Sequence, residues 1–185
     1  MILFRCFGWD RGVGAADRGG ALWFPRSLQG QGRHDAPERY GCLYVSEDPV
    51  SAVVEQLGPL AGARLDVSDL RRAGLPLALA ALRLSEDARV VDLDEPLVLA
   101  DEALRPSLVA TRDRARSQAH AALLHARHPG SAGLRWWSAF ESGWANVTLF
   151  DRAAPELAVE DVRTLDLEDD VVGEAAAFLG LAVAA

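Results

Sequence analysis

Residues 30–57 constrain the fold of this chain more than any other stretch, because three kinds of local structure follow one another there. Gln29-Gly30-Gln31-Gly32 is glycine-rich and predicts a loop whose backbone has room to approach a ligand closely. Cys42–Ser46 alternates its side chains between two faces and predicts a strand. Asp48 and Pro49 are a typical N-cap and first helical residue, so we expect a helix to follow the strand.

Arg33, Tyr44 and Glu55 lie eleven residues apart in this stretch (44 − 33 and 55 − 44), one each on the loop, the strand and the helix. Three such elements can converge on one cleft, where the guanidinium of Arg33 is suited to bind an anion. The helix has an apolar stripe formed by Val50, Val53, Val54 and Leu57. Glu55 falls on the opposite face, so spacing alone indicates a solvated surface glutamate rather than a catalytic one.

The composition favours one globular domain. With 185 residues, half of them apolar, the chain can bury a sizeable core. We expect a body at residues 1–155 and a strand-and-helix extension at 156–185 packed on the same domain. The net charge of −8 argues against a nucleic-acid-binding surface, so no direct nucleic-acid partner is expected.

The two cysteines, Cys6 and Cys42, are too few for a disulfide framework or a four-ligand zinc site. They favour a reduced, cytoplasmic protein. Residues 1–7 include Arg5 and lack the pattern of a secretory signal, and the apolar runs are too short to cross a bilayer. We therefore expect a soluble protein without a membrane partner.

Hydrophobic periodicity predicts the remaining elements. A first strand is expected at 2–7, with Arg5 facing away from the core, and a short strand at 21–24 inside the glycine-rich segment 8–32. Further strands are expected at 77–84, 89–93, 133–138, 141–150 and 157–167, and a short helix or turn at 65–70. A helix is expected at 108–128, buried through Ala115, Ala119, Ala122, Leu123 and Ala126, and another after Asp169 or Asp170.

Two clusters of chemically capable side chains remain ambiguous from the residues alone. Three histidines, His120, His125 and His128, fall in the helix at 108–128, but no carboxylate or cysteine completes a ligand set, so no metal site is expected. Three tryptophans, Trp136, Trp137 and Trp144, stand within nine residues. They can stack on a ligand ring or fill the core, which is the commoner use of tryptophan.

Several dispersed blocks resemble the RES-domain family, which is named for an Arg, Glu and Ser signature. The first block is matched by residues 32–37, 40–49 and 52–55. The second is matched by residues 111–122, 133–138 and 146–150. His34 departs from the pattern, because family members often carry an aromatic residue after the signature arginine.

The resemblance implies roles for individual residues. Arg33, Glu55 and Ser138 take the three signature positions and are the implied catalytic residues. The implied NAD-binding residues are Arg5, Arg33, Tyr44, Gln118 and Ser138.

The resemblance also implies a fold and an activity. The implied fold is α/β (α+β), a mixed sheet flanked by helices, similar to ADP-ribosyltransferases. The implied function is that of a toxin that degrades NAD, as a phosphorylase or glycohydrolase with phosphate or water as acceptor and without a metal. A partner antitoxin with a helix-turn-helix domain of the Xre type is implied, and a homodimer is left open. The alternatives are a mono-ADP-ribosyltransferase acting on a protein and a catalytically silent protein-binding module.

Overall fold

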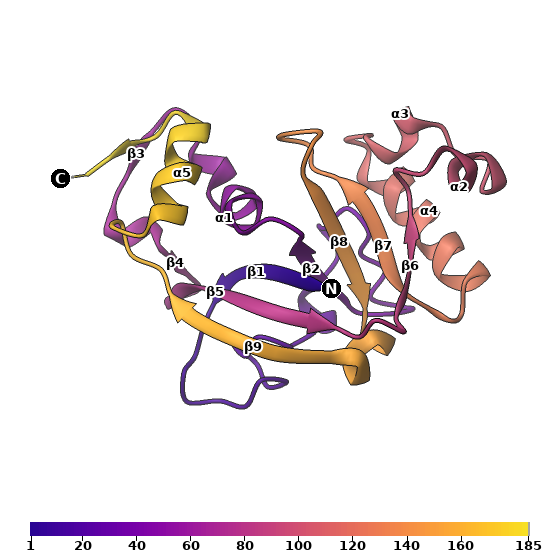
Figure 1. Cartoon of the computed structure of the whole chain (residues 1–185), viewed down its shortest axis with the longest axis horizontal. Coiled ribbons are helices and arrows are strands. Elements are labelled where there is room, and N and C mark those ends of the chain that lie inside the picture. Colours follow the sequence, from indigo (N-terminus) through magenta and orange to yellow (C-terminus); the bar gives the residue numbers. More distant parts are fainter. Residues whose placement is uncertain (185) are drawn as a thin grey trace. The chain divides into compact units, whose positions relative to one another are not determined.

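A computed structural model gives the structure of the protein and describes residues 1–184 (Figure 1). The chain divides into two compact units. The first is formed by residues 1–23, 45–83 and the segment from 158 on, and the second by residues 24–44 and 84–157. The expected boundary between 155 and 156 and the packing of the 156–185 extension stay predictions. The last residue of that extension lies outside the described part.

The first unit is built on a long antiparallel strand pair. β1 (Ile2–Gly8) pairs with β5 (Leu75–Leu84) along its whole length, from Ile2 opposite Arg83 to Gly8 opposite Leu77. The other strands of this sheet are the end of β2 (Cys42–Ser46), which pairs with β1, and β4 (Arg71–Arg72) and β9 (Leu157–Thr164), which pair with β5. A separate parallel pair joins β3 (Arg64–Leu65) to β10 (Ala182–Val183).

Two helices of the first unit lie side by side in Figure 1, α1 (Pro49–Leu57) and α5 (Asp170–Leu179). α1 also packs on β1. As predicted, Asp48 caps α1: its carboxylate accepts a hydrogen bond from the backbone N–H of Ser51 at 2.8 Å, and Pro49 is the first helical residue. The predicted helix after Asp169 is confirmed as α5, and the turn expected at 65–70 is the 3₁₀ helix Val67–Asp69.

The second unit contains the parallel strand pair that makes the sheet mixed. β6 (Arg89–Asp92) runs parallel to β7 (Ser131–Trp137), whereas β7 is antiparallel to β8 (Ala145–Phe150). The first residues of β2 lie next to β8. Counting β2 once, the two units hold eight paired strands besides β3 and β10. The predicted class, α+β with a mixed sheet flanked by helices, is confirmed.

Three helices accompany the strands of the second unit: α2 (Pro96–Asp101), α3 (Pro106–Val109) and α4 (Arg114–Arg127). α4 packs on β7 and on α3. One buried cluster joins these elements, and its members are Tyr40, Cys42, Leu93, Leu99, Val109, Ala121, Leu124, Leu134, Trp136 and Phe150. Trp136 therefore fills core, and Trp137 packs against the same cluster. Two 3₁₀ helices, Arg26–Leu28 and Asp151–Glu156, complete the unit.

Two details of the sequence-based prediction were wrong. Residues 21–24 form no strand, because the side chain of Arg5 takes the carbonyls of Gly20, Ala21 and Trp23 as acceptors. The helix expected from 108 is broken after α3 and restarts at Arg114 behind its N-cap, Asp113.

The buried face of α4 also differs from the predicted one. Its buried residues are Ser117, Ala121, Ala122 and Leu124, and four of the five residues assigned to the apolar face are exposed, namely Ala115, Ala119, Leu123 and Ala126. A polar residue explains the error. Ser117 is buried because its hydroxyl donates a hydrogen bond to the carbonyl of Arg33 at 2.7 Å, which satisfies it inside the core. A search for apolar residues passes over such a position.

The cap of α1 gives a stability prediction. Replacing Asp48 with Ala leaves the N–H of Ser51 without its side-chain acceptor and should lower the free energy of unfolding by about 1 kcal/mol. Asp48→Asn keeps an acceptor oxygen and should retain most of that stability. Urea unfolding followed by circular dichroism measures both variants. Equal midpoints for Asp48→Ala and the wild type would show that the cap contributes nothing.

Candidate functional site

Arg33 is a buried cation in the second unit. Its Nη1 donates hydrogen bonds to the carbonyls of Val109 at 3.0 Å and Thr111 at 2.6 Å, and its guanidinium carbon lies 4.9 Å from the centre of the Trp136 ring. The residue is only 7% exposed. Because a desolvated guanidinium is attracted to the face of an indole, Trp136 stabilises the charge where water cannot. The loop of Arg33 and the turn between α3 and α4 are thereby joined.

The glycine-rich loop before Arg33 wraps around an acidic side chain that sequence reasoning missed. Asp35 is 4% exposed. Its Oδ2 accepts hydrogen bonds from the N–H groups of Gly30 at 2.8 Å and Gly32 at 2.7 Å, and its Oδ1 accepts one from the hydroxyl of Tyr44 at 2.7 Å. The N–H groups of Gly30 and Gly32 thus converge on one anion, and we call this part of the loop the nest, after the backbone concavities that bind anions. A signal was present, since an aspartate placed a few residues after glycines often accepts local backbone hydrogen bonds.

Tyr44, expected to contact NAD, has its hydroxyl engaged in the same loop. Besides donating to Asp35, the hydroxyl accepts a hydrogen bond from the N–H of His34 at 2.9 Å. Burial raises the pKa of Tyr44 above its ordinary value, and the nearby charges of Cys42 and Asp35 raise it further. The phenol therefore remains a donor at physiological pH.

Gln118, also expected to contact NAD, lies on α4 and binds the backbone of the loop. Its Nε2 donates to the carbonyls of Gly30 at 3.0 Å and Gly32 at 2.8 Å. Together with the bond from Ser117 to Arg33, these bonds attach the first two turns of α4 to the carbonyls of the loop. The N–H groups of the loop bind Asp35 instead.

His34 takes an aromatic role in the core. It is 3% exposed, and its imidazole meets the Trp136 ring edge-on with the ring centres 5.2 Å apart. Burial lowers the pKa of His34 to about 3, and the positive charges of Arg33 and Arg114 act in the same direction. The imidazole is therefore neutral at physiological pH.

A hydrogen-bond pattern assigns the proton of this neutral imidazole. The hydroxyl of Thr148 lies 3.1 Å from Nε1 of Trp136, which can only donate, and 2.8 Å from Nδ1 of His34. Within residues 1–184, Nδ1 is thus the acceptor that remains for the hydroxyl hydrogen of Thr148. We assign the proton of His34 to Nε2.

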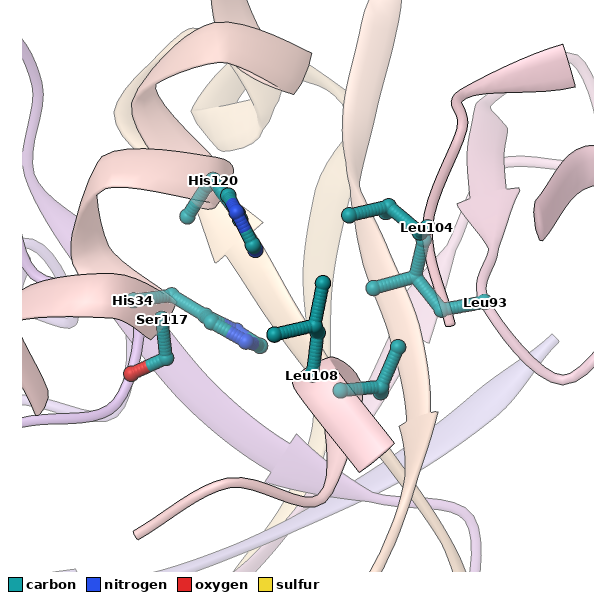
Figure 2. Close-up of a pocket in the computed structure, with 8 residues that line it drawn as sticks. His34, Leu93, Leu104, Leu108, Ser117 and His120 are labelled. Carbon is teal, nitrogen blue, oxygen red and sulfur yellow. The ribbon is translucent and has the colours of Figure 1, made fainter. Parts of the chain in front are cut away.

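The ring of His34 borders a small cavity in the second unit (Figure 2). The cavity measures about 10 Å³, roughly the room that one water molecule needs. Figure 2 shows the rings of His34 and His120 pointing toward Leu108. The cavity is too small for a nucleotide, so it is not a substrate pocket.

Ser138, the signature serine, directly follows β7 and is 3% exposed. Its hydroxyl accepts a hydrogen bond from the N–H of Phe140 at 3.1 Å, and its N–H donates to the carbonyl of Trp144 at 2.8 Å. Ser138 thus shapes the hairpin that leads to β8.

Glu55 and Arg5 lie in the first unit. Glu55 stands on α1, whose residues Val53, Val54 and Leu57 are buried as predicted, and is itself partly exposed. The Nη1 of Arg5 donates to the carbonyls of Gly20 at 3.1 Å and Ala21 at 2.6 Å, and burial lowers the pKa of Arg5 to about 9. The guanidinium therefore holds the turn at 20–23.

The structure thus brings together Arg33, Tyr44 and Gln118 in one network of the second unit and places Ser138 on the same unit's β7–β8 hairpin. Their catalytic and NAD-binding roles, and those of Glu55 and Arg5, stay predictions. Within the described residues, no group of three or more His, Cys, Asp or Glu side chains is arranged to hold a metal ion. No helix in residues 1–184 combines the length and hydrophobicity that crossing a membrane requires.

Comparison with known proteins identifies the family. A family model described as the RES domain matches residues 3–170, which is most of the chain. The chain belongs to the RES-domain family. This match confirms the RES-domain family predicted from the dispersed sequence blocks. No curated protein matches the chain.

A solved structure supports the fold of this RES-domain protein. A chain in the crystal structure of the M. tuberculosis MbcT-MbcA toxin-antitoxin complex superposes with a TM-score of 0.59. The match covers 97% of the present chain and 87% of the other, at 17% sequence identity. At this identity the likeness shows a shared fold.

The neutral, buried His34 gives a pH prediction. The native pKa of about 3 lies below the ordinary value of about 6.5, so between these values the unfolded chain binds a proton that the native protein does not. Stability from this group is present above pH 6.5 and is lost on acidification, by about 1.4 kcal/mol per pH unit within the window. His34→Phe should flatten the fall in unfolding free energy between pH 6.5 and 5, as measured by urea unfolding.

Trp136→Phe is the control for lost packing. It removes the bond to Thr148 but keeps His34, so it should lower stability at every pH and leave the slope unchanged. A slope for His34→Phe that equals the wild-type slope would contradict a neutral buried imidazole.

Proposed function

We propose that this RES-domain protein is the toxin of a toxin–antitoxin pair and cleaves NAD between nicotinamide and ribose. Membership of the family supports the proposal, as does the shared fold with a chain of a toxin-antitoxin complex. The observation that carries it is Arg33: the signature arginine is a buried cation fixed by Val109, Thr111 and Trp136, on a loop whose shape is fixed in turn.

The proposed reaction sets the demands on each residue. When the bond between the ribose carbon and the nicotinamide nitrogen breaks, its electron pair leaves with nicotinamide, and the sugar carbon becomes oxocarbenium-like. Attack by water gives ADP-ribose and a proton, and attack by phosphate gives ADP-ribose phosphorylated at the same carbon. A negative charge near the cationic sugar and a positive charge near the pyrophosphate lower the barrier.

The residue roles follow from these demands. Glu55 supplies the negative charge at the sugar. Arg33, assisted by Arg5, supplies positive charge for the pyrophosphate or for an attacking phosphate. Ser138 binds a ribose hydroxyl or the carboxamide of the leaving group, and Tyr44 packs on the nicotinamide or its ribose.

The hydrogen bonds within the second unit refine two of these roles. The hydroxyl of Tyr44 is bound to Asp35 and His34, so its part in NAD binding falls to its ring. The Nε2 of Gln118 is bound to the loop carbonyls, so its contribution to NAD binding runs through the backbone of that loop.

A nicotinamide-release assay tests the reaction. Purified protein is incubated with NAD in the presence and absence of phosphate, and Glu55→Gln should lower kcat by about 100-fold or more, because it removes the charge at the reacting carbon. Glu174→Gln is the matched control, since Glu174 is an exposed glutamate on the other long helix of the same unit and should leave the rate unchanged. Wild type and Glu55→Gln that are equally inert with both acceptors would rule out NAD cleavage.

NAD with a label on the adenylate half separates the acceptors. Free labelled ADP-ribose or its phosphate supports hydrolysis or phosphorolysis, whereas label that stays on a macromolecule supports transfer to a protein. If no nicotinamide is released and no label is transferred, the catalytically silent protein-binding module remains as the alternative.

Expression in a bacterial host tests the biological role. The wild-type chain should lower cellular NAD and stop growth, and co-expression of its cognate antitoxin, which we propose carries a helix-turn-helix domain of the Xre type, should restore both. The Glu55→Gln variant should allow growth without the antitoxin. Arrest of growth by Glu55→Gln at wild-type strength, with NAD unchanged, would contradict the proposal.

A further inference from the structure

Most of the backbone groups that the structure shows engaged in the loop at residues 30–35 bind side chains of the protein itself. The N–H groups of Gly30 and Gly32 bind Asp35, and the N–H of His34 binds Tyr44. The carbonyls of Gly30 and Gly32 accept from Gln118, and the carbonyl of Arg33 accepts from Ser117. The loop resembles a phosphate-binding nest in form, but its centre already holds an anion.

The close fit around this anion requires glycine. A Cβ at Gly32 would stand 2.4 Å from the hydroxyl oxygen of Tyr44 and 2.6 Å from Oδ1 of Asp35, closer than atoms in contact can approach. Gly30 has a φ of +145°, which side-chain-bearing residues rarely adopt. Both glycines therefore make room for the carboxylate of Asp35.

The position of Arg33 depends on the filled nest. Arg33 directly follows Gly32 and precedes the His34 N–H that binds Tyr44, so its backbone is held on both sides by groups that meet at Asp35. A buried carboxylate is stable there because it receives three hydrogen bonds, and bonds to an ionised acceptor are stronger than neutral ones.

We propose that Asp35 is an internal anion that fills the backbone nest of the 30–35 loop and thereby positions Arg33, and that a carboxylate from solution can take its place when the side chain is removed. Asp35 is thus a positioning residue, and the nest is a carboxylate site. The consequence for catalysis rests on the proposed function of Arg33, whereas the occupancy of the nest does not.

Chemical rescue tests the carboxylate site directly. Asp35→Ala removes the carboxylate that formate can replace, so sodium formate should raise the melting temperature of Asp35→Ala by several degrees in a saturable manner. Sodium chloride at the same ionic strength should not. The wild type and Asp113→Ala, which loses an exposed aspartate that also accepts a backbone N–H, should show no specific response.

A formate response that is absent from folded Asp35→Ala, or that is equal in the wild type, would overturn the proposal. If Asp35→Ala does not fold, Asp35→Asn provides the test by NMR. Loss of the charge should move the amide protons of Gly30 and Gly32 upfield, because their acceptor is no longer ionised, and unchanged shifts would overturn the proposal equally.

The activity arm connects the nest to NAD cleavage. Asp35→Ala should lower kcat/KM by about 100-fold through misplacement of Arg33, and formate should restore a large part of it. Arg33→Ala should be as impaired as Asp35→Ala and should gain nothing from formate. A wild type that cleaves no NAD would sink the proposed function alone, since the melting and NMR outcomes decide the nest without any substrate.

Discussion

The second unit depends on the interactions that one buried cation, the guanidinium of Arg33, makes with the core around it. A guanidinium loses its hydration when it is buried, and Arg33 recovers that loss through two backbone carbonyls and the face of Trp136. Trp136 in turn belongs to the cluster that contains Leu134, Val109 and Phe150. The residues that hold Arg33 therefore also belong to the core of this unit. A change in core packing acts on the guanidinium that we propose binds the pyrophosphate of NAD.

The sequence was sufficient where the physical signal is local. Asp48 and Pro49 predicted the start of α1, and the alternation in Cys42–Ser46 predicted β2. Both signals are local, because caps and period-two patterns depend on neighbours in the chain. The dispersed RES blocks then gave the family and the mixed α+β sheet, which the structure and the family match confirm.

The sequence alone was insufficient where a polar partner elsewhere in the chain decides whether a residue is buried or joins a strand. Ser117 is buried because of a carbonyl 84 residues away, and residues 21–24 lose their strand to the side chain of Arg5. Asp35 was overlooked because an aspartate after glycines indicates only local backbone hydrogen bonds, and that pattern does not show that the side chain is buried and also bound to the hydroxyl of Tyr44. The spacing that made Glu55 a plain surface residue likewise says nothing about charge chemistry, and only the family resemblance gave it a role.

The side chain of Gln29 joins the chain just before the 30–35 loop to the start of β2. It exchanges two hydrogen bonds with the backbone of Cys42, as a neighbouring strand would. The partners lie 13 residues apart, Tyr44 and Asp35 nine apart, and Gly30 and Asp35 five apart. Closing such short loops costs less chain entropy than the bonds to α3, α4 and the turn between them, which span 76 to 88 residues. The shape that presents Arg33 is thus encoded by its own short stretch of chain, and the rest of the second unit is needed to enclose it.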